Sequence, residues 1–135
     1  MGKKEILSIL WIFVTVNYIF CDVFTLMFSE ELKQILSGTV GTVIINQSFL
    51  LTFAIIMEIP MAMIFLSRFL IFRINRPLNI IAGLVLTTIQ AGSLFVGTPT
   101  MHYLFFSIIE IATTIAIVWF AWKWNYADNK SNNLI

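Results

Sequence analysis

The chain has very few residues of the kinds that bind metals or carry redox chemistry. It contains a single cysteine, Cys21, and a single histidine, His102. One cysteine cannot form an intramolecular disulfide or a Cys-x-x-Cys redox pair, and one histidine cannot ligate a haem iron from both sides. No spacing of cysteine, histidine and carboxylate residues is typical of a zinc site. We therefore expect no metal site and no cofactor, and no motif identifies a catalytic residue.

Charged residues are scarce as well. They make up 11% of the 135 residues, whereas 59% are hydrophobic, and the formal net charge is only +1. A chain with this balance has too little polar surface to cover a soluble domain. It also lacks the basic face that would favour nucleic acid as a partner. The composition predicts one integral membrane domain over residues 1–135, surrounded by a lipid bilayer.

Four apolar segments are long enough to cross a bilayer, which takes about 20 residues as a helix. They lie at residues 6–28, 49–71, 78–96 and 101–124. The first begins like a signal peptide but lacks a small-x-small cleavage site, so we expect it to be retained. The connections "FRINRP" and "GTPT" predict tight turns between antiparallel helices. Residues 29–48 form an outer loop, with a short interfacial helix in the first half and an extended or re-entrant piece in the second.

These segments predict an all-α fold, an integral membrane antiparallel four-helix bundle. Its orientation follows from seven cations that fall on one side of the four spans. They are Lys3, Lys4, Arg68, Arg73, Arg76, Lys123 and Lys130. Only Lys33 lies on the other side. Because lysine and arginine favour the cytoplasmic side of a membrane, we expect both the N and C termini in the cytoplasm.

Polar side chains within the spans are the candidate functional residues, since a charge at the bilayer centre costs about 2.5 to 3.5 kcal/mol. The candidate ligand- or proton-binding residues are Glu58, Glu110, Asp22, Asn17, Gln90, Tyr18, Tyr103, Ser107 and Thr114. Helical spacing places Glu110 on one face with Ser107 and Thr114, so we expect it to point inward. The third span carries a small and polar stripe that suits close helix contact. The stripe consists of Asn79, Gly83, Thr87, Gln90, Ser93 and Gly97.

Glu58 has no polar neighbour on its own helical face. We expect it near the midplane, facing inward and within reach of Glu110. Between this level and the cytoplasmic arginines, the inward faces are expected to be apolar. No cation lies at the depth of the two glutamates, and a carboxyl group in an apolar medium favours its neutral form. Both glutamates are therefore expected to hold a proton part of the time near neutral pH.

Five strings resemble those of a family of small bacterial four-span membrane proteins of unknown function. They are "LWIFVTVNYIFCDV", "MEIPMAMIFLSR", "NIIAG", "FFSIIEIA" and "WFAWKW". The resemblance covers nearly the whole chain and implies a multi-pass protein of the cell inner (plasma) membrane, but it transfers no activity. The chain is more loosely similar to DoxX-like and sterol-isomerase-type four-helix membrane proteins. In length it resembles small multidrug exporters, but their first helix carries a glutamate where this chain has Asn17 and Asp22.

Three functions are compatible with these features. The first is proton-linked transport or binding of a small amphipathic or cationic solute by Glu58 and Glu110, as a homodimer because four helices enclose little space. The second is a membrane-embedded acid/base enzyme of the isomerase type acting on a lipophilic substrate. The third is an accessory or structural subunit of a larger membrane complex, in which the polar residues hold helices together.

Overall fold

The computed structural model describes residues 2–40, 43–95 and 98–125, so the predictions at Val96, Gly97 and Lys130 lie outside the described residues. Within these ranges five helices and a two-stranded hairpin form, and the predicted all-α class is confirmed. The elements are α1 (Lys3–Met27), α2 (Ser29–Leu36), β1 (Thr39–Val40), β2 (Val43–Ile44), α3 (Gln47–Phe69), α4 (Phe72–Ser93) and α5 (Met101–Lys123).

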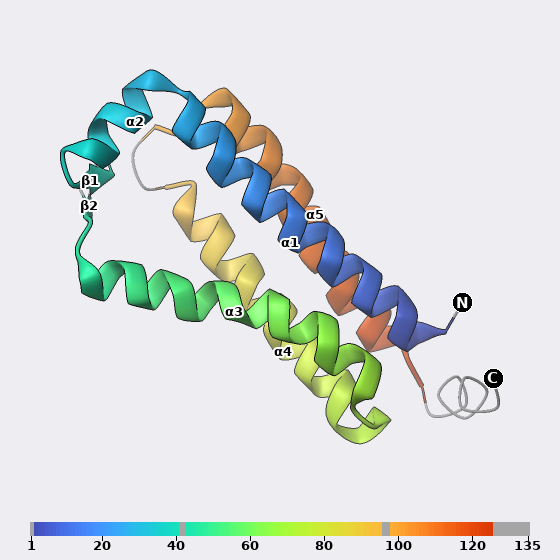
Figure 1. Cartoon of the computed structure of the whole chain (residues 1–135). Coiled ribbons are helices and arrows are strands. Elements are labelled where there is room, and N and C mark those ends of the chain that lie inside the picture. The colour runs from blue at the N-terminus through green and yellow to red at the C-terminus, as the bar shows by residue number, and fades with distance from the viewer. Residues whose placement is uncertain (1, 41–42, 96–97, 126–135) are drawn as a thin grey trace.

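Helices α1, α4 and α5 run in similar directions, and the start of α1 and the end of α5 are at the same end of the molecule (Figure 1). Helix α5 packs along both α1 and α4, and α3 packs along α1. Helices α3 and α4 touch far less. Towards the end that carries the hairpin, α3 runs away from α1 (Figure 1). One side of α3 is therefore left without a helix against it.

The predicted outer loop contains α2 and the hairpin. Ser37 caps the C-terminal end of α2. Gly38 then adopts a left-handed φ of +87°, and its N–H donates to the carbonyl of Ile35 at 3.0 Å. Glycine adopts this conformation without the steric cost that a Cβ would bring, which lets the chain leave the helix abruptly. The two strands then pair antiparallel, with Thr39 opposite Ile44.

The turn between α3 and α4 is shorter than "FRINRP" predicted. Helix α4 already begins at Phe72, so the whole of that string forms its first turns instead of a loop. Asn75 explains the difference, because its Nδ2 atom donates to the carbonyls of Ser67 at 2.8 Å and Leu70 at 3.1 Å. These carbonyls at the end of α3 have no partner within their own helix. One buried amide thus joins the end of α3 to the start of α4.

A buried polar cluster holds α1, α3 and α4 together near the end where the chain starts. Trp11 Nε1 of α1 and Ser67 Oγ of α3 both donate to Asn79 Oδ1, at 2.7 and 3.1 Å. Asn79 Nδ2 donates in turn to Asn75 Oδ1 at 2.6 Å. All four side chains are 0% exposed. The expectation of apolar inward faces between Glu58 and the arginines was therefore wrong, because buried amides and hydroxyls satisfy one another there.

Candidate functional site

Glu110 is the buried carboxyl around which the candidate site is built. It lies in the middle of α5 and is 1% exposed, and Ser107 and Thr114 on the same face are buried with it. The predicted inward orientation of this face agrees with the structure. Among the buried side-chain nitrogen and oxygen atoms of the described residues, only Glu110 Oε1 and Trp124 Nε1, at the end of α5, have no hydrogen-bond partner. A buried oxygen of this kind costs free energy unless it binds a proton or accepts a hydrogen bond from a ligand or a water molecule.

Helix α1 contributes the groups that face Glu110. Tyr18 and Cys21 are buried on α1 and lie within electrostatic range of the Glu110 carboxyl, as does Tyr103 of α5. Asp22 acts on Glu110 as well, although its own side chain is exposed, and no described cation does so. The structure thus brings four of the predicted residues to one place between α1 and α5.

Three hydrogen bonds join side chains around this site. Gln90 Nε2 of α4 donates to Ser107 Oγ at 2.6 Å, and Thr87 Oγ1 donates to Thr114 Oγ1 at 2.7 Å. Ser93 Oγ and the Tyr103 hydroxyl are 2.6 Å apart. Each of these bonds links α4 to α5, as the small and polar stripe predicted. The Gln90–Ser107 and Thr87–Thr114 pairs therefore close the α4 side of the site.

Asn17 does not join the site. Its Nδ2 atom donates to the carbonyl of Phe13 in its own helix at 2.8 Å, and the side chain is half-buried. At 100° per residue it points about 100° away from Tyr18, outside the α1 face that packs on α5. The amide is satisfied locally, so nothing requires it to face another helix.

The predicted inward orientation of Glu58 was wrong. Its side chain is exposed, and the face it shares with other residues is exposed along its length. That face consists of Leu51, Ala54, Ile55, Glu58, Met61, Ala62 and Phe65. The buried residues of α3 are Pro60, Met63 and Ser67, which lie about 140° to 200° around the helix from Glu58. No hydrogen bond in the described part of the chain joins Glu58 to Glu110.

Two polar residues between α1 and α5 were not among the predicted site residues, and of these Cys21 lies within electrostatic range of Glu110. Cys21 follows Tyr18 by three positions, so helical spacing was a usable signal for it. His102 has no such signal, because its role depends on where α1 ends. Its Nε2 atom lies 3.2 Å from Thr25 Oγ1 of α1, and its ring is 6.3 Å from that of Phe28. His102 therefore fastens the end of α1 to the start of α5.

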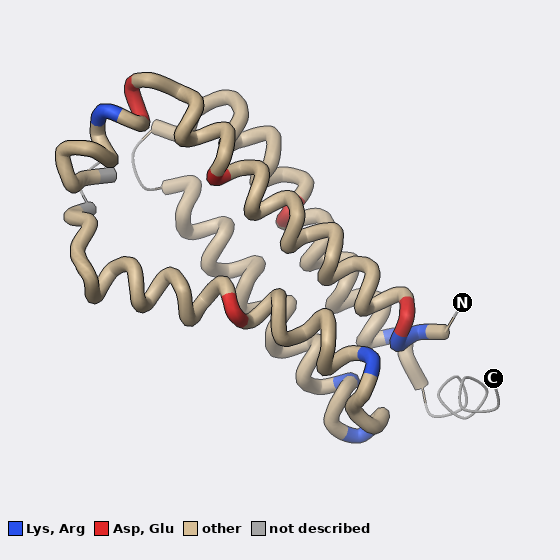
Figure 2. The backbone as a smooth tube through the Cα atoms, viewed as in Figure 1, with Lys and Arg blue, Asp and Glu red and all other residues tan. Residues whose placement is uncertain are grey.

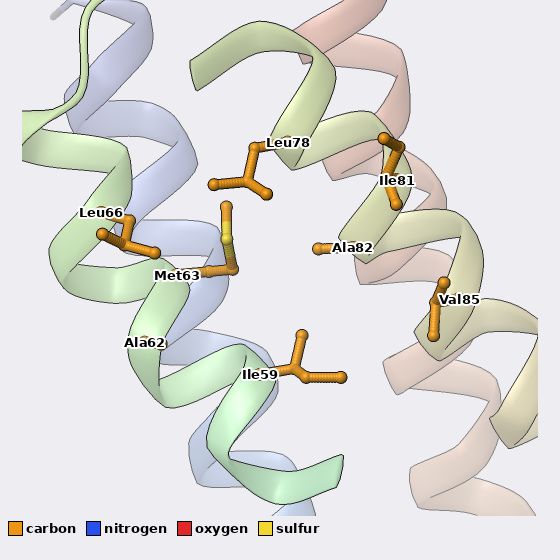
Figure 3. Close-up of a pocket in the computed structure, with 8 residues that line it drawn as sticks. All are labelled: Ile59, Ala62, Met63, Leu66, Leu78, Ile81, Ala82 and Val85. Atoms are coloured by element: carbon orange, nitrogen blue, oxygen red, sulfur yellow. The ribbon is translucent and has the colours of Figure 1, made fainter. Parts of the chain in front are cut away.

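Two further kinds of site can be assessed from the described residues. No group of three or more His, Cys, Asp or Glu side chains lies close enough together there to hold a metal ion. An apolar pocket of about 280 Å³ lies between α3 and α4 (Figure 3). It is lined by Ile59, Ala62, Met63, Leu66, Leu78, Ile81, Ala82 and Val85. Neither Glu58 nor Glu110 is among these residues, so the pocket and the carboxyl site are separate.

Helix length and composition define the class of protein. In the described part of the chain α1, α3 and α5 are each long and apolar enough to cross a membrane. The chain is therefore an all-α protein in which three of the described helices are both long and apolar enough to cross a membrane. It belongs to the Family of unknown function (DUF6326), whose profile matches residues 1–131. No protein of curated function and no solved structure matches it.

Proposed function

We propose that the chain is a multi-pass protein of the cell inner membrane, in which four antiparallel helices form a bundle with both termini in the cytoplasm. Support for α1, α3 and α5 comes from their length and apolar composition. Helix α4 is less apolar, but its amides Asn75, Asn79 and Gln90 are all buried against other helices. A helix whose polar groups are satisfied internally can still present an apolar surface to lipid.

The charges support this orientation. Most lysine and arginine residues gather at the end of the molecule where α1 starts and α5 finishes (Figure 2). The opposite end carries Lys33 of α2 together with Glu30 and Glu31. Helix ends rich in lysine and arginine stay on the cytoplasmic side of a membrane. At this basic end, the guanidinium of Arg76 donates to the carbonyls of Ala121 and Trp122 at the end of α5.

The crossing of α4 distinguishes a four-span topology from a three-span one, because α4 is less apolar than α1, α3 and α5. Alkaline phosphatase is fused after Leu36, Ile71, Phe95 or Trp124, since this enzyme is active only outside the cytoplasm. We expect activity for the fusions after Leu36 and Phe95 and none for the other two. Green fluorescent protein at the same positions should give the inverse pattern. Phosphatase activity after Ile71, or none after Phe95, would contradict the four-span topology.

We further propose that Glu110 binds a proton in exchange for a small amphipathic or cationic solute. The observation that carries this proposal is the fully buried Oε1 atom without a partner among the described residues. A carboxylate inside a membrane must be neutralised, because neither lipid nor apolar side chains solvate its charge. With no described cation acting on it, a proton or a bound cation has to do so.

The surroundings suit such an exchange. The hydroxyl groups of Tyr18 and Tyr103 can orient a ligand beside Glu110, and their aromatic rings can face a cation. Asp22 is exposed and adds negative charge near Glu110, on the side of the end that carries the hairpin. A solute that arrives with a positive charge would then displace the proton of Glu110, and its departure would let the proton return.

Binding of tetraphenylphosphonium to the purified protein in nanodiscs tests this proposal. We expect the affinity to rise with pH, because only the deprotonated Glu110 can pair with the cation. In weakly buffered solution each bound cation should release a proton, which a pH indicator dye detects. The Glu110→Gln variant should lose proton release and bind the cation at least about tenfold more weakly.

Glu58→Gln provides the matched control, because it makes the same change in the other span carboxyl. It should keep both cation affinity and proton release, since the structure places Glu58 away from the site. Proton release that persists in Glu110→Gln, or is absent from the unaltered protein, would refute the proposed exchange. The isomerase alternative gains no support from the apolar pocket, because that pocket contains no carboxyl group to act as acid or base.

A further inference from the structure

In the proposed topology, the exposed carboxyl of Glu58 lies where lipid would surround it. It lies at the middle of α3, with as many helical residues before it as after it. At 1.5 Å per residue it is about 16 Å from either end of the helix, which is beyond the reach of a glutamate side chain. Its carboxyl therefore cannot reach the membrane surface by bending along the helix.

Helix α3 is also the least buried of the three described helices that are long and apolar enough to cross a membrane. Only 11% of its most apolar stretch is buried, compared with 39% in α1 and 33% in α5. Apolar side chains can face lipid at no cost, so this exposure alone requires no partner. Glu58 is different, because lipid offers no group that can donate a hydrogen bond to it.

Small residues flank Glu58 on the same face. Ala54 precedes it by four positions and Ala62 follows it by four, so one lies a turn above and the other a turn below. Small residues at this spacing let the backbones of two membrane helices approach closely. The face thus combines a polar group that needs a partner with the shape that admits a second helix.

We infer that the Glu58 face of α3 is the interface between two copies of this chain, packed in parallel about a two-fold axis along the membrane normal. Such an axis keeps every residue at its own depth, so the Glu58 carboxyls of the two copies meet. A protonated carboxyl group can both donate and accept a hydrogen bond, so two identical carboxyl groups can hydrogen-bond to each other. The hydrogen bond between a carboxyl and a carboxylate is short and strong. A different protein would have to bring a matching polar group to this depth.

This inference does not depend on the proposed exchange at Glu110, which lies on a different helix. Disulfide crosslinking tests the interface directly, in a Cys21→Ser background and in membranes with excess lipid. Single cysteines replace Ala54 or Ala62 on the Glu58 face, and Ile108 on the exposed face of α5 serves as the matched control. We expect crosslinking at least about tenfold faster at the two alanine positions, because a disulfide requires Cα atoms within about 7 Å.

A second measurement separates the role of Glu58 from mere proximity. The dimer fraction in liposomes is followed by energy transfer between labelled copies for Glu58→Gln and Glu58→Leu. The amide is also self-complementary, so Glu58→Gln should remain dimeric, whereas Glu58→Leu should dissociate about tenfold more readily. Leucine suits a lipid-facing position, so this variant should keep its helical circular dichroism and elute as a single species.

Three results would overturn the inference. The first is an unaltered protein that stays monomeric in liposomes. The second is crosslinking at the Ile108 position as fast as at the alanines. The third is a different membrane protein that crosslinks to the alanine positions in place of a second copy, which would favour the accessory role instead.

Discussion

Replacement of Asn79 by leucine should destabilise the protein by about 2 to 6 kcal/mol. Leucine is similar in size, so the loss arises from the polar partners left behind. Trp11 Nε1 and Asn75 Oδ1 would each remain buried without their hydrogen bond to Asn79, at about 1 to 3 kcal/mol per group. Ser67 loses less, because its hydroxyl can turn to a carbonyl of its own helix. Unfolding by SDS titration, followed by far-ultraviolet circular dichroism, measures the change.

Asn17→Leu is the matched control for this prediction. It makes the same substitution at an amide that bonds only within its own helix, so its effect should stay within about 0.5 kcal/mol. Adding Trp11→Phe to Asn79→Leu removes the stranded N–H, and the double variant should lose less stability than the two single changes added together. Equal losses for Asn79→Leu and Asn17→Leu would show that the buried cluster contributes no stability.

The buried cluster also shows what the sequence can predict and what it cannot. The polar stripe of α4 was found by its spacing, and Asn79, Gly83 and Gln90 are buried as expected. The partners of Asn79 were not found, because Trp11 and Ser67 lie on two other helices. Helical periodicity determines which face of a helix is polar, but the relative depth of two helices follows from how they pack.

Helix α3 shows where periodicity fails outright. Apart from Glu58, the middle of this helix is apolar on every side, so its inward face was assigned from one residue. The structure turns the opposite side towards α1, with Pro60, Met63 and Ser67 buried. Ser67 was a weak signal in favour of that side. A helix that is apolar all round carries no information about its rotation, and its neighbours then decide.

Asp22 shows a third limit. It points about 40° from Tyr18 on α1, which is within the buried face by angle alone. It is nevertheless exposed, because α3 diverges from α1 towards that end of the molecule (Figure 1). The fold class and the inward face of α5 with Glu110 could therefore be predicted from the sequence. The exposure of Asp22 could not, because it depends on the angle between two helices.

Replacement of Gly83 by leucine is the second large effect that we expect, at about 3 kcal/mol of destabilisation. A Cβ atom on Gly83 would lie 2.6 Å from Val118 Cγ2 and 3.3 Å from the carbonyl oxygen of Thr114. The carbonyl belongs to the backbone of α5 and cannot turn aside, so α4 and α5 must separate. Separation would strain the hydrogen bond between Thr87 and Thr114, one turn further along. SDS titration again measures the loss.

Gly92→Leu is the control within the same helix, because nothing lies within 4 Å of a Cβ at that position. Its effect should be near zero or slightly stabilising, since leucine favours a helix over glycine by nearly 1 kcal/mol. Gly83→Ala tests the cause, because its single added carbon meets Val118 first, and Val118→Ala should restore part of the loss. If Gly83→Leu were as harmless as Gly92→Leu, α4 would not need to approach α5 closely. The wall that Gln90 and Ser107 form beside Glu110 would then be free to open.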